Sequence, residues 1–216
     1  ARAVVESKSF DHGLICGAEH NLVVDARIRS DFVQALEAAG AAVLDQDETE
    51  AARTVLIHGR RNVFRPGTIG QDAGALAEKA GIERDHPIRV LVIPTGEATE
   101  KNPLAGEKMA PVLSLFEVEG DEEAMTLCRA LLDLEGTGHT ATLHTRDEEM
   151  ARGYAEAMPA SRILVNSPGT QGVVGLTTGL TPSFTLGCGT FGGNSTTENV
   201  SYTELVNVKR MAWNVP

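Results

Sequence analysis

The 216-residue sequence has few basic residues, few cysteines and no long hydrophobic run. It contains 19 lysines and arginines against 30 aspartates and glutamates, which gives a formal net charge of -11 at neutral pH. Such a surface repels phosphate groups and argues against nucleic acid or anionic lipid as a partner. The apolar runs are too short for a membrane-spanning helix, and the first residues lack the apolar core of a signal peptide. These shortages favour a cytoplasmic protein.

Only three cysteines are present: Cys16, Cys128 and Cys188. An odd number without Cys-x-x-Cys spacing argues against a disulfide framework and against a zinc site. We therefore expect free thiols in a reducing compartment and no metal site.

The sequence does contain a clear alternation of short apolar strands and amphipathic helices. Strands are predicted at 21–25, 88–93, 140–144 and 162–166, a further apolar run lies at 112–118, and helices are predicted at 27–39, 70–80, 121–134 and 147–157. Residues 47–57 form either a helix or a passage from helix to strand. Apolar strands separated by helices are typical of an α/β domain, with a largely parallel twisted sheet flanked by helices.

Residues 167–195 break this pattern, because they are rich in Gly, Thr, Pro and Ser and show no clear periodicity. A stretch of this length inside a compact domain is usually functional. Residues 187–192 match Gly-x-Gly-x-x-Gly, but residues 193–197 make a poor start for the helix that a dinucleotide fingerprint needs. A glycine-rich loop that closely approaches a ligand is the better interpretation.

Cys16 stands in a bend of small residues, with Gly13 and Gly17 near it. Such a bend gives a nucleophilic thiol room for a substrate and backbone N–H groups that can stabilise an oxyanion. A buried structural cysteine is the other interpretation, and these residues alone leave both open. Cys128 lies on the apolar face of a predicted helix, which favours core packing, and Cys188 between two glycines fits a tight loop.

His139 follows Gly-Thr-Gly and precedes a predicted strand. A histidine at this place serves equally well as a proton carrier near neutral pH or as a hydrogen-bonded structural residue. If it pairs with Cys16, the protein is a Cys–His acyl hydrolase or transferase. A further alternative is a non-catalytic module that uses residues 202–216 to pair with the sheet edge of a partner.

Several segments are more specific together than singly. They are Phe-Asp-His-Gly to Cys at 10–16, Ala-Gly-Glu-Lys-Met-Ala-Pro-Val-Leu at 105–113, Gly-Thr-Gly-His-Thr at 136–140, Arg-Ile-Leu-Val-Asn at 162–166 with Gln-Gly at 171–172, and the block at 182–195. In this order they closely resemble the catalytic half of the CoA-acylating aldehyde dehydrogenases, over essentially the whole chain. Leu-Gly-Cys-Gly and Gly-Gly-Asn-Ser within 186–195 point to the acylating branch, and a non-acylating aldehyde dehydrogenase is the alternative.

This resemblance implies an oxidoreductase that converts an aldehyde, CoA and NAD(P)⁺ reversibly into acyl-CoA and NAD(P)H through a cysteine thioester. Cys16 matches the family's nucleophile, and His139 matches a histidine typical of the acylating branch. The implied cofactor-binding residues are Glu107, which matches a glutamate that contacts the nicotinamide ribose, and Leu186, Gly187 and Gly189 of the loop beside substrate and nicotinamide.

The resemblance also implies a division into domains. Residues 1–200 match the catalytic thiol domain, and residues 201–216 match a C-terminal tail that joins subunits into an oligomer. The NAD-binding domain of the family lies mainly before the cysteine, so we expect it to be absent from this sequence. The chain alone is therefore expected to be inactive, although the complete enzyme uses NAD or NADP with an aldehyde and coenzyme A.

Overall fold

The computed structural model describes all residues from 1 to 216, and its longer strands form two separate sheets. The strands span Asn21–Asp25 (β1), Ala41–Val43 (β2), Ile57–His58 (β3), Val63–Phe64 (β4), Val90–Pro94 (β5), Val112–Val118 (β6), Gly138–Leu143 (β7) and Ala160–Val165 (β8). The larger sheet has the order β1-β6-β5-β2, with every neighbouring pair parallel. The smaller sheet pairs β7 with β8 in parallel, and β3 and β4 form a short antiparallel hairpin.

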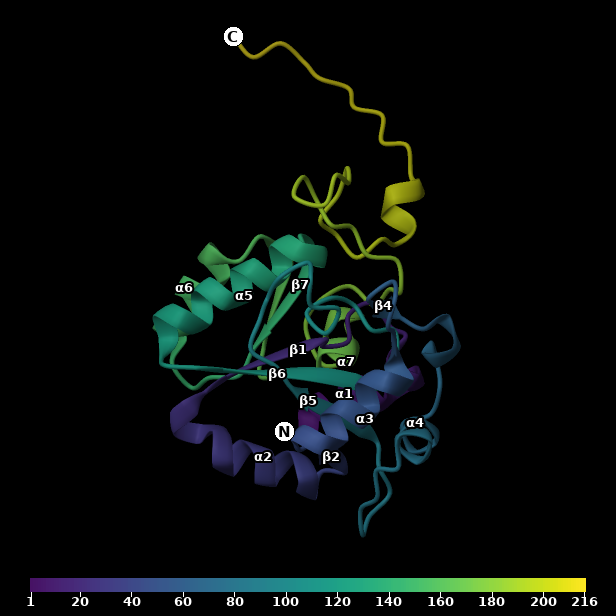
Figure 1. Cartoon of the computed structure of the whole chain (residues 1–216). Helices are drawn as coiled ribbons and strands as arrows, with labels where there is room; N and C mark the ends of the chain where they lie inside the picture. Colours follow the sequence, from purple (N-terminus) through teal and green to yellow (C-terminus); the bar gives the residue numbers. More distant parts are fainter.

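Helices cover both sheets. They span Arg2–Ser9 (α1), Arg29–Ala38 (α2), Gln46–Leu56 (α3), Ala73–Ala80 (α4), Asp121–Glu135 (α5), Glu148–Ala157 (α6) and Gly169–Val173 (α7), with 3-10 turns at Phe10–Gly13 (η1), Ala26–Ile28 (η2), Pro66–Thr68 (η3) and Tyr202–Leu205 (η4). Figure 1 shows α5 and α6 together beside β7, while the C-terminal segment runs away from the body of the molecule.

Helices cover both faces of the larger sheet. Successive side chains of β5, one of its two inner strands, point to opposite faces, so they pack in two different clusters. Val90 and Val92 pack with side chains of α1 and α2 in one core cluster. Leu91 and Ile93 pack with side chains of α3 and α4 in the other. All four side chains are completely buried. This two-sided burial explains why the strand is apolar along its whole length instead of alternating.

The smaller sheet has its own core on the side of α5 and α6. Ala141 of β7 packs there with Tyr154 and Met158, and Cys128 of α5 lies at the margin of the cluster. Cys128 therefore contributes to packing, which confirms the sequence-based interpretation. Burial raises the pKa of its thiol above the ordinary value.

The predicted α/β class is confirmed, and the predicted elements recur within a few residues of their expected bounds. Helix α1, strand β2 and helix α7 have no predicted counterpart. In α1 the polar side chains of Ser7 and Lys8 take two of the four buried positions, so no apolar stripe marks the helix. The division of the strands into two sheets also depends on long-range pairing, which strand composition does not encode.

The C-terminal residues 206–216 contain no helix or strand. Their large apolar side chains are exposed, and Trp213 is 80% accessible to solvent. None of the helices combines the length and the apolar character that crossing a bilayer requires.

Candidate active site

Cys16 follows a strained turn at the end of α1. Asp11, His12 and Gly13 have φ angles of 46°, 52° and 73°. Left-handed backbone is uncommon at residues other than glycine, and such strain is concentrated at functional sites. The turn leads to Cys16, whose side chain is exposed and forms no disulfide. The thiol is therefore accessible to a substrate.

Gly17 sets the backbone of Cys16 against α7. A Cβ atom at Gly17 would overlap the side chain of Val173, so only glycine fits there. A Cβ atom at Gly169 would lie 2.6 Å from the carbonyl oxygen of Gly17, so the two segments touch through their backbones. The N–H groups of Cys16 and Gly17 donate no hydrogen bond to another residue of the chain. Both are available to an oxygen atom bound beside the thiol.

Residues 186–199 form a glycine-rich loop whose two ends pair with each other. Leu186 forms a bridge to Asn199, and the N–H of Gly187 donates to the carbonyl oxygen of Glu198 at 2.9 Å. A Cβ atom at Gly138, the first residue of β7, would overlap the backbone of Cys188 and of the loop that follows it. The glycine-rich loop therefore rests directly on the start of β7.

The sequence indicated Leu186, Gly187 and Gly189 as candidate cofactor-binding residues, and these residues lie in two different environments. Gly187 and Gly189 are buried, while Leu186 packs at the margin of a small cluster with Leu164 and Val173. Any contact that these three residues make with a ligand is therefore mainly through backbone. No helix follows Gly192, so the Gly-x-Gly-x-x-Gly match is not a dinucleotide fingerprint, as predicted.

Several charges act on the Cys16 thiol. Burial by the surrounding residues raises the pKa of Cys16, although its own backbone N–H partly opposes this rise. The charges of Glu107 and Cys188 raise the pKa further, whereas the charge of Arg162 lowers it. Because the thiolate is the nucleophilic form, Cys16 in this chain is mostly protonated at neutral pH and needs a cation or a base to react.

Glu107 stands at the end of a series of buried polar side chains. Its carboxylate is 47% exposed, and Oε1 lies 3.7 Å from Nε2 of His20. The other ring nitrogen, Nδ1, lies 3.2 Å from Nζ of Lys8 and accepts the backbone N–H of Lys108 at 3.3 Å. With donors on Nδ1, we assign the ring proton to Nε2, which faces Glu107.

Both lysines of this series are fully enclosed, with 0% of Lys8 and 1% of Lys108 exposed. Burial lowers the pKa of Lys8 to about 7, although the charges of Glu19 and Glu107 act in the opposite direction. Burial also holds the pKa of Lys108 and of His20 well below their usual ranges. Sequence analysis missed this cluster, because no periodic pattern identifies a lysine as buried.

His139 lies on β7, where its Nδ1 is 2.9 Å from Oγ1 of Thr140. No hydrogen bond joins His139 to Cys16. Burial lowers the pKa of His139, and the charge of Arg162 lowers it further. The ring is therefore neutral at neutral pH, in the form that accepts a proton.

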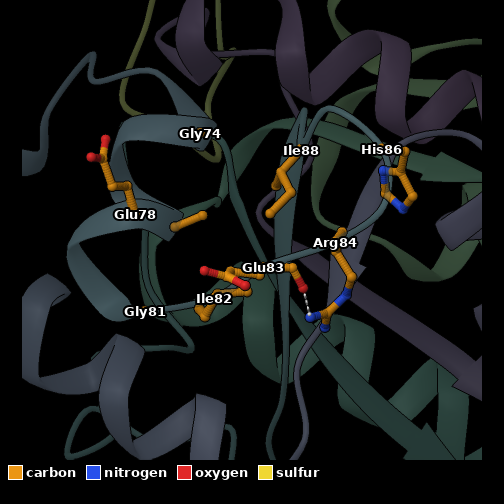
Figure 2. Close-up of a pocket in the computed structure, with 9 residues that line it drawn as sticks. Gly74, Glu78, Gly81, Ile82, Glu83, Arg84, His86 and Ile88 are labelled. Carbon is orange, nitrogen blue, oxygen red and sulfur yellow. Dashed lines mark hydrogen bonds between the residues drawn. The ribbon is translucent and has the colours of Figure 1, made fainter.

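No group of three histidine, cysteine, aspartate or glutamate side chains is arranged to hold a metal ion. A surface hollow of about 370 Å³ lies between α4 and the segment after it and contains none of the residues discussed above (Figure 2). Its arginine, Arg84, is paired with Glu48 at 2.6 Å, and His86 lies 3.4 Å from Glu37. This hollow therefore has no free cation for an anionic ligand.

Comparison with known proteins places this geometry among aldehyde dehydrogenases. The chain is 34% identical over 98% of its length to aldehyde-alcohol dehydrogenase 2 of Entamoeba histolytica, of which it covers 25%. It is 32% identical over 99% of its length to an acetylating succinate-semialdehyde dehydrogenase of Clostridium kluyveri, of which it covers 47%. An acetylating aldehyde dehydrogenase from Geobacillus thermoglucosidasius, solved as a crystal structure, matches all of this chain with a TM-score of 0.91 and 37% identity.

This chain covers 48% of the Geobacillus protein in that crystal structure. It therefore spans between a quarter and a half of the length of these relatives. No family model matches the sequence.

Substitution of Lys8 by methionine tests whether Lys8 is neutral in the folded protein. A folded-state pKa of about 7, against an ordinary 10.5, means that the unfolded chain binds more protons between these values. Below pH 7 the buried Lys8 is charged and destabilises the folded protein fully. Above pH 7 the folded protein releases this proton, so the free energy of unfolding of the parent protein, compared with that of Lys8→Met, should rise by up to roughly 1.4 kcal/mol per pH unit. Urea unfolding followed by circular dichroism at several pH values measures this difference. Lys79→Met, at an exposed position, is the control, and a pH-independent difference for Lys8→Met would show that buried Lys8 stays charged.

Substitution of Gly138 by alanine tests the contact between β7 and the glycine-rich loop. The new methyl group would overlap the loop backbone, and the φ angle of 85° disfavours any residue with a Cβ atom. We expect the amide hydrogens of Gly187 and Gly189 to exchange at least about tenfold faster, as measured by mass spectrometry. Gly153→Ala is the matched control, because a Cβ atom there meets nothing within 4 Å. Equal exchange in both variants would contradict the described contact.

Proposed function

Since this chain belongs to the acylating aldehyde dehydrogenases, we propose that it is the thiol-bearing part of an enzyme that converts an aldehyde, CoA and NAD(P)⁺ into acyl-CoA and NAD(P)H. The observation that carries the proposal is the accessible Cys16 thiol, with two unpaired N–H groups beside it and the charge of Glu107 acting on it. We assign residues 1–200 to the catalytic domain.

In the proposed reaction the Cys16 thiolate attacks the carbonyl carbon of the aldehyde, and the carbonyl oxygen becomes an oxyanion. The free N–H groups of Cys16 and Gly17 bind that oxyanion. A nicotinamide bound at this site would accept the hydride that the adduct loses, and the acyl group would then remain on Cys16 as a thioester. The thiolate of CoA then attacks the thioester, and acyl-CoA departs as the Cys16 thiolate is released. Exclusion of water from the closed site favours attack by this thiol over hydrolysis.

His139 is proposed to accept the proton of an incoming thiol. Its ring is neutral near pH 7, because burial and the charge of Arg162 both lower its pKa. A neutral imidazole with one free nitrogen is suited to this role. The hydrogen bond to Thr140 holds Nδ1 and leaves Nε2 as that free nitrogen.

The residues of this chain fit the nicotinamide end of the cofactor and not its phosphates. Glu107 offers a half-exposed carboxylate that can accept hydrogen bonds from ribose hydroxyls, with His20 behind it. Leu186, Gly187 and Gly189 lie next to Cys188 in the glycine-rich loop, and the charge of Cys188 acts on the Cys16 thiol. No helix begins after the glycine-rich loop, so no helix N-terminus stands there for a pyrophosphate. We therefore assign the rest of NAD or NADP to a nucleotide-binding domain outside these residues.

The remaining proposals concern assembly and compartment. The exposed apolar side chains of residues 201–216 suit a tail that joins subunits into an oligomer. Three free thiols are compatible with a reducing cytoplasm. A Cys–His acyl hydrolase gains no support from the geometry, since His139 bonds to Thr140 and not to Cys16. A non-acylating aldehyde dehydrogenase would release a free acid instead of an acyl-CoA.

Substitution of Cys16 by serine, in a subunit that includes the proposed nucleotide domain, tests the nucleophile. The hydroxyl is a far weaker nucleophile, so acyl-CoA formation should fall by at least about a thousandfold while the fold is kept. The measurement is NADH release with an aldehyde and CoA, together with mass spectrometry of the acylated protein. Cys128→Ser, within the core on α5, is the control and should keep the activity. Near-normal acyl-CoA production by Cys16→Ser would refute the proposal.

The chain of 216 residues by itself is expected to show no dehydrogenase turnover, because the proposed binding site for most of the nicotinamide cofactor lies outside it. The assay is the same NADH release, with an aldehyde and CoA present in excess. Addition of a separately expressed nucleotide-binding domain is the positive control. Turnover by the chain alone would overturn the proposed division of the enzyme.

A further inference from the structure

Arg162, the third residue of β8, is buried to 97% and lacks a carboxylate partner. Its guanidinium donates to Oδ1 of Asn199 at 2.7 Å and to the carbonyl oxygen of Gly187 at 2.7 Å. Two further bonds reach the carbonyl oxygens of Thr197 and Glu198 at 3.0 and 3.1 Å. The residue is 3% exposed, and all four of its bonds go to amide or carbonyl oxygens and none to a carboxylate. Four neutral acceptors, all in the glycine-rich loop, thus surround a full positive charge.

We infer that Arg162 is a positioning residue for the site around Cys16. It holds the glycine-rich loop on β8, and it keeps a positive charge, unpaired with any carboxylate, near the thiols of Cys16 and Cys188. The catalytic meaning of this role rests on the proposed function of Cys16. A buried arginine is normally paired with a carboxylate, because an isolated buried charge is strongly unfavourable. Here neutral dipoles solvate the guanidinium without cancelling its charge.

The hydrogen bonds of Arg162 also connect the loop to the backbone next to Cys16. Asn199 receives the Arg162 Nε bond on Oδ1 and donates from Nδ2 to the carbonyl oxygen of Val173 at 2.8 Å. Val173 is the residue against which Gly17 packs. Arg162 is therefore linked through two side chains to the residue that follows Cys16. On the other side, Arg162 pairs in register with Thr140, the neighbour of His139.

The positive charge of Arg162 can therefore act on the thiol of Cys16. Around Cys16 the charges of Glu107 and Cys188 oppose ionisation, and Arg162 is the cation that favours it. Around Arg162 the charges of Cys188, Cys16 and Glu198 support the protonated guanidinium against its burial. Glu198 itself is exposed, so it neutralises the cation only weakly. A cation facing a thiol favours the thiolate and steadies any oxyanion formed on it.

The experiment separates the holding of the loop from the effect of the charge. In the 216-residue protein, the rate of Cys16 alkylation by iodoacetamide is followed from pH 6 to pH 10 by mass spectrometry of the Cys16 peptide. Arg162→Met should slow alkylation at pH 7.5 by at least about threefold, with the rates converging at high pH, where the thiol is fully ionised. Arg162→Lys keeps the charge and should stay within about twofold of the parent, while its loop amides exchange faster because the four bonds are lost.

Arg152→Met, an exposed substitution on α6 with the same change of charge, is the matched control and should leave the profile unchanged. If Arg162→Met does not fold, Asn199→Asp replaces it, since a carboxylate beside Nε cancels the charge with little change of shape. This variant should also slow Cys16. A folded Arg162→Met, or otherwise an Asn199→Asp, with the parent's pH profile would overturn the inference and leave Arg162 a purely structural residue.

Alkylation needs neither CoA nor nicotinamide, so this result is independent of the proposed function. A Cys16→Ser enzyme that still forms acyl-CoA would refute the proposed function and leave the measured effect of Arg162 on Cys16 intact. Conversely, an unchanged alkylation profile in the Arg162 variants would refute the inference and leave Cys16 as the proposed nucleophile.

Discussion

The close approach of Gly17 to Val173 is the constraint on which the thiol site depends. It presses the segment before β1 against α7, which follows β8, and so helps to join two sheets that share no strand pair. A hydrogen bond from the N–H of Gly169 to Glu19, across 150 positions of sequence, fixes the same junction. Cys16 is thus placed by contacts between backbone segments, and a side chain at Gly17 would separate the parts that carry the reactive groups.

The site is built on polar groups that a stable core would exclude. Lys8 and Lys108 are buried on either side of His20, and Arg162 lies under the glycine-rich loop. Each is destabilising unless its hydrogen bonds are complete, because burial disfavours the charged form. The burial of these groups beside Glu107 and the glycine-rich loop indicates that the fold gives up stability to fix the direction of a few polar side chains, while the larger sheet supplies the compensating apolar core.

Much of the architecture could be predicted from the sequence, because long apolar strands and amphipathic helices such as β5 and α5 are local signals. The family resemblance, carried by ordered short segments, is confirmed by the relatives. The α1 helix and the roles of Lys8 and Arg162 could not be predicted. A charged residue in a short helix or strand is usually exposed, and only long-range packing makes these two exceptions. The sequence singled out Cys16 and Glu107 as candidate site residues. It gave no sign of the contact between His20 and Glu107, which lie 87 positions apart and meet only in the folded chain.

The tail has a practical consequence for spectroscopy. Trp213 is the sole tryptophan, and it lies on the exposed C-terminal segment, away from both cores. Its fluorescence will therefore report whether the tail meets another surface and will change little when the sheets unfold. A blue shift on concentration or on addition of a partner domain would signal docking, whereas a denaturation curve recorded from tryptophan emission would miss the core transition.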